Sequence, residues 1–349
     1  MGLKILHSAD WHLDTPFAGF IGAQKRFLKE ELDKIPGKVA DICRRENCDL
    51  VLLAGDLFDG PYTKESAQIL KDALAECAVP VFISPGNHDF CGPGSAWLEE
   101  VWPENVHVFT GGVESVAVPE LDCRVYGAAF HAMDCPGHLE GFRTEGEETW
   151  HLGVFHGDPV SQNSPYCPIT NSQVRESGLN YLALGHIHKT GSFQAGDTLC
   201  AWSGSPMGRG YDETGEKSIS ILELGENQNL RRISLDLPCF YEITVDSTEQ
   251  SLEDLLPPAG STDFYRVTLT GQARDAEEDI LQKFPNLELR DRREAPVDLW
   301  AGAEEDTLEG TFFRMLRDSM EDAQEENRSL IRLAAELSRK ILEGREVVL

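Results

Sequence analysis

Residues 50–59 read Leu-Val-Leu-Leu-Ala-Gly-Asp-Leu-Phe-Asp, and this stretch decides the expected fold. The apolar run Leu50–Ala54 predicts a short strand buried on both faces, as in the parallel sheets of α/β proteins. Gly55 then allows a tight turn that places Asp56 at the carboxyl end of the strand, where open α/β sheets bind their ligands. A carboxylate there is costly to desolvate without a positive charge nearby, so Asp56 predicts a bound cation.

Four other apolar segments are also followed by side chains that can bind a metal ion. The segments are Leu3–His7, Val79–Ile83, Leu152–Phe155 and Tyr181–Leu184. The side chains after them are, in chain order, Asp10 and His12, Asn87 and His88, His156, and His186 and His188. Polar residues after a strand are usually turn chemistry and a lone histidine is usually a core residue, but five such strand ends in one chain favour a common site.

The number of candidate ligands indicates how many ions the site holds. One catalytic ion needs about three protein ligands, so these eight groups predict two ions. Such ions lie roughly 3.5–4 Å apart and share a carboxylate, and Asp56 is the expected bridge because it follows the central strand. Nitrogen and oxygen donors without a thiolate favour manganese, iron(II) or zinc over calcium. A water molecule shared by the two ions would be hydroxide near neutral pH and could attack phosphorus in line.

The composition limits the compartment and the partners. The chain has 349 residues, a formal net charge of -29, and nine cysteines without a Cys-x-x-Cys spacing. The scattered cysteines are typical of reduced thiols, which predicts a cytoplasmic protein. The sequence has no apolar run of the ~18 residues that a transmembrane helix needs, so no membrane partner is expected. Proteins that grip nucleic acid alone usually have a basic face, so any DNA binding is expected to be local, metal-assisted or supplied by a partner. The acidity could equally serve only solubility.

The expected elements divide the chain into three parts. Residues 1–238 alternate strands with helical patterns, among them Gln24–Asn47 and Lys64–Cys77, which predicts an α/β domain. Residues 239–300 predict a small α+β module, with strands at Tyr241–Val245, Phe264–Leu269 and Leu287–Arg290, helices near Leu252–Leu256 and Ala276–Phe284, and a linker marked by Pro296 and Gly302. Residues 301–349 contain two amphipathic helical patterns, which either pack on their own module or bind a partner.

Five motifs follow one another in a characteristic order: Asp10-x-His12, Gly55-Asp56-x-x-Asp59, Gly86-Asn87-His88-Asp89, His156-Gly157 and Gly185-His186-x-His188. As a set they resemble the calcineurin-like metallophosphoesterases, and the resemblance implies a four-layer αββα sandwich. It also implies two ligand sets: Asp10, His12, Asp56 and His188 on one ion, and Asp56, Asn87, His156 and His186 on the other. His88 matches the family's catalytic histidine, which does not bind metal and which stabilises the transition state or protonates the leaving oxygen. Asp59 and Asp89 are expected to support the ligands from outside the set.

A narrower resemblance is to the SbcD-type DNA repair exonucleases. It rests on residues 12–17 (His-Leu-Asp-Thr-Pro-Phe), Gly55–Asp59 and Leu184–Lys189, while Gly204–Pro206 and Glu213–Lys217 are similar to the YhaO-like branch. The resemblance implies a manganese-dependent nuclease with a small capping module and C-terminal helices that dock on a coiled-coil ABC-type ATPase of the SbcC kind. Some nucleases of this wider group have a second histidine where this chain has Asp59, so the role of that position stays open.

Three functions remain open on these grounds. The first is a DNA exonuclease or endonuclease of DNA repair, whose ATPase partner would supply the basic surface. The second is a small-molecule phosphodiesterase, a nucleotidase or a protein phosphatase on the same site, which explains the acidity without a partner. The third is a non-catalytic scaffold that anchors an ATPase, and it is disfavoured because every expected ligand position is filled. A homodimer through Gln24–Lys38 or Lys64–Cys77 is a further alternative that the composition does not decide.

Overall fold

The computed structural model describes residues 2–226, 228–247, 261–271, 284, 286–293, 298–342 and 344. The chain divides into two compact units, the first made of residues 1–242, 260–266 and 286–288, the second of residues 243–259, 267–285 and 289–349. The helices expected at Leu252–Leu256 and Ala276–Phe284 and the linker residue Pro296 lie outside the described residues, apart from Phe284.

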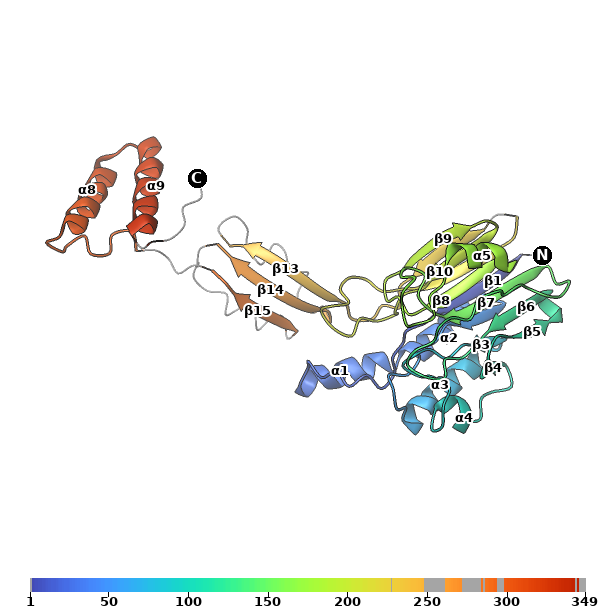
Figure 1. Cartoon of the computed structure of the whole chain (residues 1–349). Coiled ribbons are helices and arrows are strands. Elements are labelled where there is room, and N and C mark those ends of the chain that lie inside the picture. Colours follow the sequence, from blue (N-terminus) through green and yellow to red (C-terminus); the bar gives the residue numbers. More distant parts are fainter. Residues whose placement is uncertain are drawn as a thin grey trace. The chain divides into compact units, whose positions relative to one another are not determined.

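The first unit contains two six-stranded mixed sheets (Figure 1). In the first sheet the order is β12 (Asn229–Ile233), β11 (Ile219–Leu224), β1 (Leu3–Ser8), β2 (Leu50–Leu53), β3 (Val81–Ile83) and β4 (Val106–Val108). Strands β1 to β4 are parallel, and β11 and β12 extend the sheet antiparallel beside β1. Every residue of β2 is buried, which confirms the strand predicted from the apolar run.

The second sheet repeats this plan with other segments. Its order is β5 (Glu114–Val118), β6 (Cys123–Gly127), β7 (Trp150–His156), β8 (Tyr181–Gly185), β10 (Thr198–Trp202) and β9 (Gly191–Ala195). Strands β6, β7, β8 and β10 are parallel, and β5 and β9 are antiparallel edges. The metal-ligand motifs therefore follow parallel strands of both sheets, so their side chains emerge at the carboxyl ends of the strands.

The helices of this unit agree with the helical periodicity of the sequence. The pattern at Gln24–Asn47 forms two helices, α1 (Gly22–Leu32) and α2 (Ile35–Glu46), and Lys64–Cys77 forms α3. Helix α3 begins with a capping box, in which the Thr63 side chain accepts a hydrogen bond from the Ser66 backbone N–H. The shorter elements are α4 (Ala96–Glu99), a 3-10 turn at Pro119–Leu121, and α5 (Asn171–Ser177).

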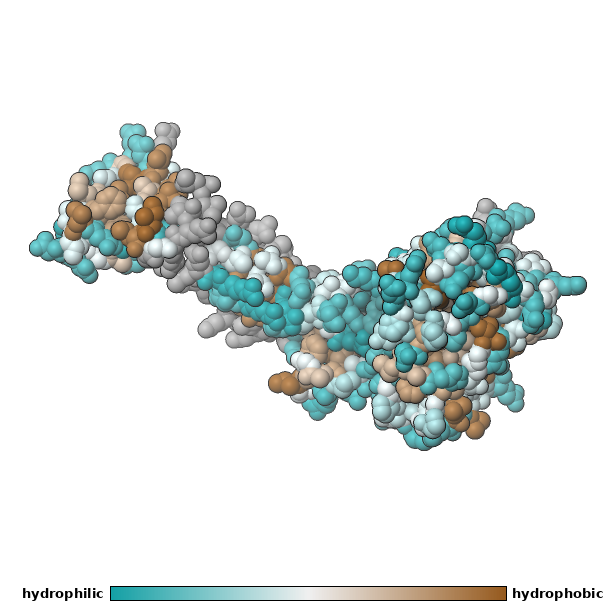
Figure 2. Space-filling model, viewed as in Figure 1, coloured by the Kyte–Doolittle hydropathy of each residue, from teal (hydrophilic) through white to brown (hydrophobic). Residues whose placement is uncertain are grey.

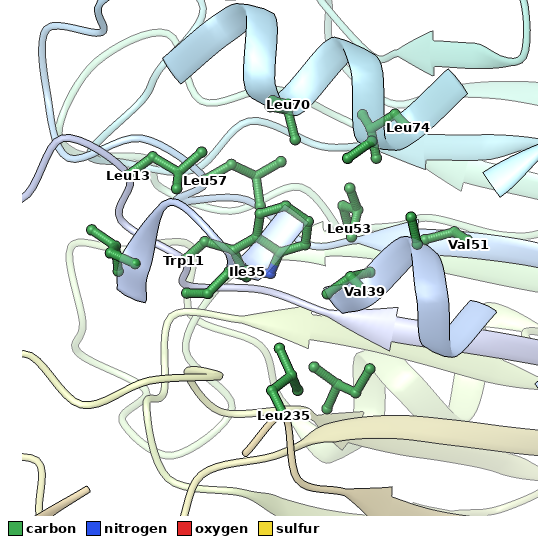
Figure 3. Close-up of a cluster of buried hydrophobic side chains, with 14 of the residues drawn as sticks. Trp11, Leu13, Ile35, Val39, Val51, Leu53, Leu57, Leu70, Leu74 and Leu235 are labelled. Atoms are coloured by element: carbon green, nitrogen blue, oxygen red, sulfur yellow. The ribbon is translucent and has the colours of Figure 1, made fainter. Parts of the chain in front are cut away.

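A hydrophobic cluster joins α1, α2 and α3 to the first sheet (Figure 3). Trp11 lies in this cluster with Leu53 of β2 and with Val39 and Leu70 of the helices, and it is only 1% exposed. Its indole N–H donates to the Ser8 hydroxyl at 2.7 Å. Because Trp11 stands between Asp10 and His12 in the sequence, the packing of its ring fixes the backbone that carries both side chains.

A second cluster fills the space between the two sheets. It combines Ile5, Leu50 and Leu52 of the first sheet with Val125, Leu152 and Val154 of the second. His7 connects the sheets through polar contacts, with Nδ1 2.7 Å from the Tyr181 hydroxyl and Nε2 3.1 Å from the Leu184 carbonyl oxygen. Burial lowers the pKa of His7 to about 3, so the bridge is neutral and costs no buried charge. The outer face of the second sheet carries a third cluster, which includes Val174 of α5.

The C-terminal part contains a small sheet and two helices, as its sequence pattern predicts. The sheet has the order β13 (Phe240–Asp246), β14 (Phe264–Thr270) and β15 (Leu287–Asp291). Helices α8 (Leu308–Asp322) and α9 (Glu325–Leu342) pack around the fully buried Phe313 and Ala335. The Arg339 guanidinium lies 3.8 Å above the Phe313 ring. Among the described residues, no helix combines the length and the apolar character that crossing a membrane requires.

Candidate metal centre

The candidate ligands stand on strained backbone at the ends of β1, β2 and β8. Asp10, His12, Asp56 and His186 have φ of 56°, 51°, 52° and 89°, the left-handed region that favours glycine. Backbone hydrogen bonds fix two of these turns to each other, from the Asp10 N–H to the Gly55 carbonyl oxygen and from the His12 N–H to that of Asp56, both at 3.0 Å. Strain of this kind persists only where the surroundings over-determine it, and it clusters at functional sites.

Two histidines define a first cation position. The Nε2 atoms of His12 and His188 lie 3.2 Å apart. The Nδ1 of His188 lies 2.7 Å from a carboxylate oxygen of Glu213, so that nitrogen carries the proton and Nε2 presents its lone pair. The Nδ1 of His12 makes no hydrogen bond among the described residues and lies 3.5 Å from Asp59 Oδ1. Two imidazole nitrogens this close need a proton or a cation between them, and Asp10 completes this group within 4.8 Å.

A second cation position lies around Asp56. The Nδ1–H of His156 donates to the Ala54 carbonyl oxygen at 2.8 Å, which leaves Nε2 to face the Asn87 amide oxygen at 2.9 Å and Asp56 Oδ2 at 3.4 Å. Burial alone would lower the pKa of His156, but the charge of Asp56 raises it to about 9. Without a cation, a proton therefore occupies the place that these acceptors surround, and a divalent ion would displace it.

Asp10 and Asp56 connect the two positions. Asp56 Oδ1 accepts the His88 backbone N–H at 2.9 Å, and Asp10 Oδ1 accepts that of His186 at the same distance. Their other carboxylate oxygens face the histidines, and Asp10 Oδ2 is buried without a hydrogen-bond partner among the described residues. An orphaned buried carboxylate oxygen is expensive, and a metal ion would satisfy it. The donor set of carboxylates, imidazoles and one amide fits a pair of divalent cations.

His186 is the least closely placed of the predicted ligands. Its ring centroid lies 5.4 Å from that of His156 and 4.9 Å from that of Tyr166. Among the described residues, its ring belongs to none of the groups of three side chains whose ligand atoms lie within 4.8 Å of one another. The structure therefore places the His186 ring at the border of the second position rather than inside it.

His88 forms a separate pair with Asp59 at the open side of the site. Its Nδ1 lies 2.9 Å from Asp59 Oδ1, and its side chain is 38% exposed. The hydrogen bond to Asp59 raises the pKa of His88. Burial alone would raise the pKa of Asp59, but the nearby imidazoles of His12 and His88 hold it well below its usual range. This arrangement keeps the His88 imidazole protonated to higher pH, in a position that solvent and substrate can reach.

Asp89 supports the site from behind and does not face the ions. One of its oxygens lies 2.7 Å from the Gly86 N–H and 3.2 Å from the Asp56 N–H, and the other lies 2.7 Å from the Leu57 N–H. These bonds join the turn after β2 to the turn after β3, so Asp89 fixes the direction of the Asp56 side chain.

Two residues that the ligand motifs did not reveal complete the site. Glu213 orients His188, and Arg209 pairs with Glu213 at 3.0 Å and reaches Asp59 at 3.8 Å. A carboxylate behind a metal-binding histidine is a common supporting arrangement. The run Glu213–Lys217 stands out in the sequence only as a family-like segment, and no spacing rule connects it to His188, which precedes Glu213 by 25 residues.

Two glycines are required by close packing at the site. A Cβ at Gly86 would lie 2.2 Å from Asp56 Oδ1, and one at Gly185 would lie 2.1 Å from the Ala54 carbonyl oxygen. Both distances are far below van der Waals contact, so a side chain at either position would displace the ligands.

A cleft of about 740 Å³ opens beside Asp59 and Arg209. Arg266 and Tyr211 line it further along, and the Arg266 guanidinium lies 3.8 Å above the Tyr211 ring. Arg266 also pairs with Glu242 and Glu288, and Arg209 with Glu213. The cleft thus combines aromatic and cationic groups whose charges are largely balanced by carboxylates.

Several known proteins are similar to this chain. The chain is 33% identical over 241 residues to an uncharacterized metallophosphoesterase, YhaO, of Bacillus subtilis, a match that covers 64% of this chain and 57% of that protein. It is 22% identical to the SbcD component of the SbcCD nuclease of Staphylococcus epidermidis over 82% of this chain and 84% of that protein. A dimetal phosphatase of Danio rerio aligns with a TM-score of 0.45 and 12% identity over 67% of this chain and 96% of its own. The family model of the calcineurin-like phosphoesterases matches residues 3–190, so the chain belongs to this family.

Proposed function

We propose that this protein is a two-metal phosphodiesterase that acts on DNA. The observation that carries the metal-dependent chemistry is the pair of His12 and His188, whose Nε2 atoms lie 3.2 Å apart beside Asp10 Oδ2, a buried oxygen without a hydrogen-bond partner among the described residues. A shared proton could bridge the two imidazoles, but it would leave Asp10 Oδ2 without a partner, whereas a divalent cation would satisfy all three atoms. We assign Asp10, His12, Asp56 and His188 to one ion, and Asp56, Asn87, His156 and His186 to the other, with manganese as the proposed metal.

The residues around the ions have distinct proposed roles. When bound, the two ions would supply a hydroxide nucleophile and neutralise charge on the phosphoryl group. His88, held protonated by Asp59, donates a hydrogen bond or its proton to the leaving oxygen. Arg209 is 22% exposed at the mouth of the cleft and can bind a phosphate oxygen there.

Action on DNA rests on the relative named as part of a nuclease, because that similarity continues beyond residues 3–190 into the C-terminal part. We propose that residues 239–300 form a capping module for the nuclease domain 1–238. The net charge of -29 and the balanced arginines of the cleft argue against strong binding of DNA by this chain alone. An ATPase partner of the SbcC kind, acting in the cytoplasm, would supply the missing positive surface.

The C-terminal helices are the proposed docking segment for that partner. Figure 2 shows hydrophobic side chains gathered on their surface. Leu308 is 91% exposed and Phe312 42% exposed, and with Ile341 and Leu342 they line an apolar groove of about 570 Å³. Exposed apolar surface of this kind marks a binding site for another protein.

A small-molecule phosphodiesterase is the second candidate, and the paired arginines of the cleft favour it. A nucleotide brings only one or a few phosphates, so it needs no extended basic surface. The pairing of these arginines neither favours nor disfavours a protein phosphatase, because a protein substrate would also contact surface outside the cleft.

Hydrolysis assays separate these candidates. The purified protein with manganese is offered end-labelled linear duplex DNA and, in parallel, bis-p-nitrophenyl phosphate, with His88→Ala as the blank. Degradation of both substrates by the wild type alone supports the nuclease. Hydrolysis of the small ester alone by the isolated protein contradicts autonomous action on DNA, and the same result with the ATPase present would overturn the nuclease proposal.

The docking proposal has its own test. Deletion of residues 306–349 is expected to abolish copurification of the ATPase while hydrolysis of the small ester continues. A matched point variant, Phe312→Asp, places a charge in the groove without removing the helix. Copurification that survives both changes would place the ATPase on another surface.

A further inference from the structure

Two cysteines and a histidine come together away from the two-ion centre. Cys135 and His138 lie in the segment between β6 and β7, and Cys167 lies between β7 and α5. Their ligand atoms all lie within 4.8 Å of one another, and Cys135 Sγ is 3.4 Å from His138 Nε2. The sequence alone predicts only scattered thiols, because the third member is remote from the Cys-Pro-Gly-His segment that carries the other two.

We propose that Cys135, His138 and Cys167 form a third metal site, which binds a zinc ion through three protein ligands with water in the fourth position and joins the two segments that carry them. Two thiolates and an imidazole are the donors that zinc prefers, whereas the two-ion centre has no sulfur ligand. In a tetrahedral site with Zn–S near 2.3 Å and Zn–N near 2.0–2.1 Å, a sulfur and a nitrogen ligand lie about 3.5 Å apart. The 3.4 Å between Cys135 and His138 fits this geometry.

The surroundings also suit a bound cation that is reached from one side. Cys167 is fully buried, Cys135 is 8% exposed, and His138 is half-buried at the rim. Metal binding would release the thiol protons to solvent and leave both sulfurs as thiolates.

The proposed ion would join two segments that meet behind the catalytic centre. The Cys135 N–H donates to the Pro165 carbonyl oxygen at 2.8 Å, and the Cys167 N–H to that of Cys135 at 2.7 Å. Tyr166, next to Cys167, places its ring against His186 with 4.9 Å between centroids. A metal crosslink here would therefore fix the segment that packs on a candidate ligand of the second ion.

A disulfide between Cys135 and Cys167 is the competing product of the same geometry. Both cysteines are free thiols in this structure. Oxidation to a disulfide would consume both sulfur ligands and exclude the ion. Metal binding and disulfide formation therefore give opposite results in one measurement of bound metal.

Cobalt(II) substitution tests the site by a signal that only sulfur ligands produce. The reduced, full-length protein is stripped with a chelator and titrated with cobalt(II), and the thiolate-to-cobalt charge-transfer absorption is recorded. Zinc content is measured in parallel on protein purified with zinc. We expect a charge-transfer band in the wild type, its loss in Cys135→Ser and Cys167→Ser, and one equivalent less zinc in both variants. The manganese-dependent centre, which has no thiolate, gives no such band.

Cys200→Ser is the matched control, because Cys200 is fully buried in the same hydrophobic cluster but does not belong to the Cys-His-Cys group. It should keep the band and the zinc. His138→Asn changes the half-buried ligand at the rim, so it reports on the site even if a cysteine variant fails to fold. A wild type without the band, or with an intact mass lower by two hydrogen atoms and no bound metal, overturns the proposal.

Discussion

The carboxylate of Glu213 offers the sharpest test of the proposed metal centre, because it contacts a single candidate ligand, His188. Glu213 Oε1 lies 2.7 Å from His188 Nδ1 and 3.0 Å from Arg209, and its side chain is 9% exposed. Burial alone would raise the pKa of Glu213, but the hydrogen bond from His188 and the charge of Arg209 lower it to about 2, so the group is ionised at neutral pH. The carboxylate thereby fixes the His188 tautomer and makes the Nε2 lone pair a stronger ligand for a metal ion.

Replacing Glu213 by glutamine keeps an oxygen acceptor and removes the charge. Loss of such a supporting partner typically weakens metal binding about 10–100-fold, which corresponds to about 1.4–2.7 kcal/mol. We expect a loss of this size at the ion that we assign to His188 and a smaller change at the other ion. Arg209 retains Asp59 at 3.8 Å, so the fold should be little affected.

The measurement is a manganese titration of chelator-stripped protein, followed by calorimetry and by the electron paramagnetic resonance signal of free manganese. Glu216→Gln is the matched control, because it removes the same charge from the same run at an exposed position. Thermal unfolding of both variants without metal checks that they fold. Equal manganese affinities in the two variants would refute the reasoning. If both were weakened, the lost negative charge would explain the change; if neither were weakened, the contact between Glu213 and His188 would not support metal binding.

Three further perturbations test other contacts. Asp59→Asn replaces the carboxylate whose hydrogen bond and charge raise the pKa of His88. The imidazolium would then lose its proton at lower pH, so the alkaline limb of the pH–rate profile should shift to lower pH. An alkaline limb that does not shift would contradict the role of His88. Gly86→Ala places a Cβ 2.2 Å from Asp56 Oδ1 and should abolish metal binding with circular dichroism unchanged; retained metal content would argue against Asp56 as the bridge. Phe313→Ala removes a fully buried ring and should cost the helical pair about 3–5 kcal/mol, which a loss of helical signal without loss of ester hydrolysis would reveal.

Much of the local structure could be predicted because it depends on neighbouring residues. Strand β2 is recognisable from five consecutive apolar residues, and α3 has the predicted bounds because its cap and its periodicity are both local. The polar residues after the strands also indicate a common site, since parallel strands present their carboxyl ends at one edge.

Contacts between remote segments could not be predicted in the same way. Apart from the two sheets that the family resemblance implies, the sequence does not indicate that β11 pairs antiparallel with β1, or which metal motifs follow strands of which sheet, because strand pairing depends on the whole packed core. Asp89 illustrates this point: its position in the motif suggests a place near the ligands, and only the fold directs its oxygens to backbone N–H groups.

The sequence by itself determined the kinds of donor available, their order, and the strands that carry them, because these are properties of short segments. The tertiary structure decided which nitrogen of His188 faces its neighbour, that Glu213 stands behind it, that His186 lies at the border, and that Cys167 meets Cys135. These are distances of a few ångströms between residues far apart in the chain. They arise only when the sheets pack and bury polar groups that must then find partners.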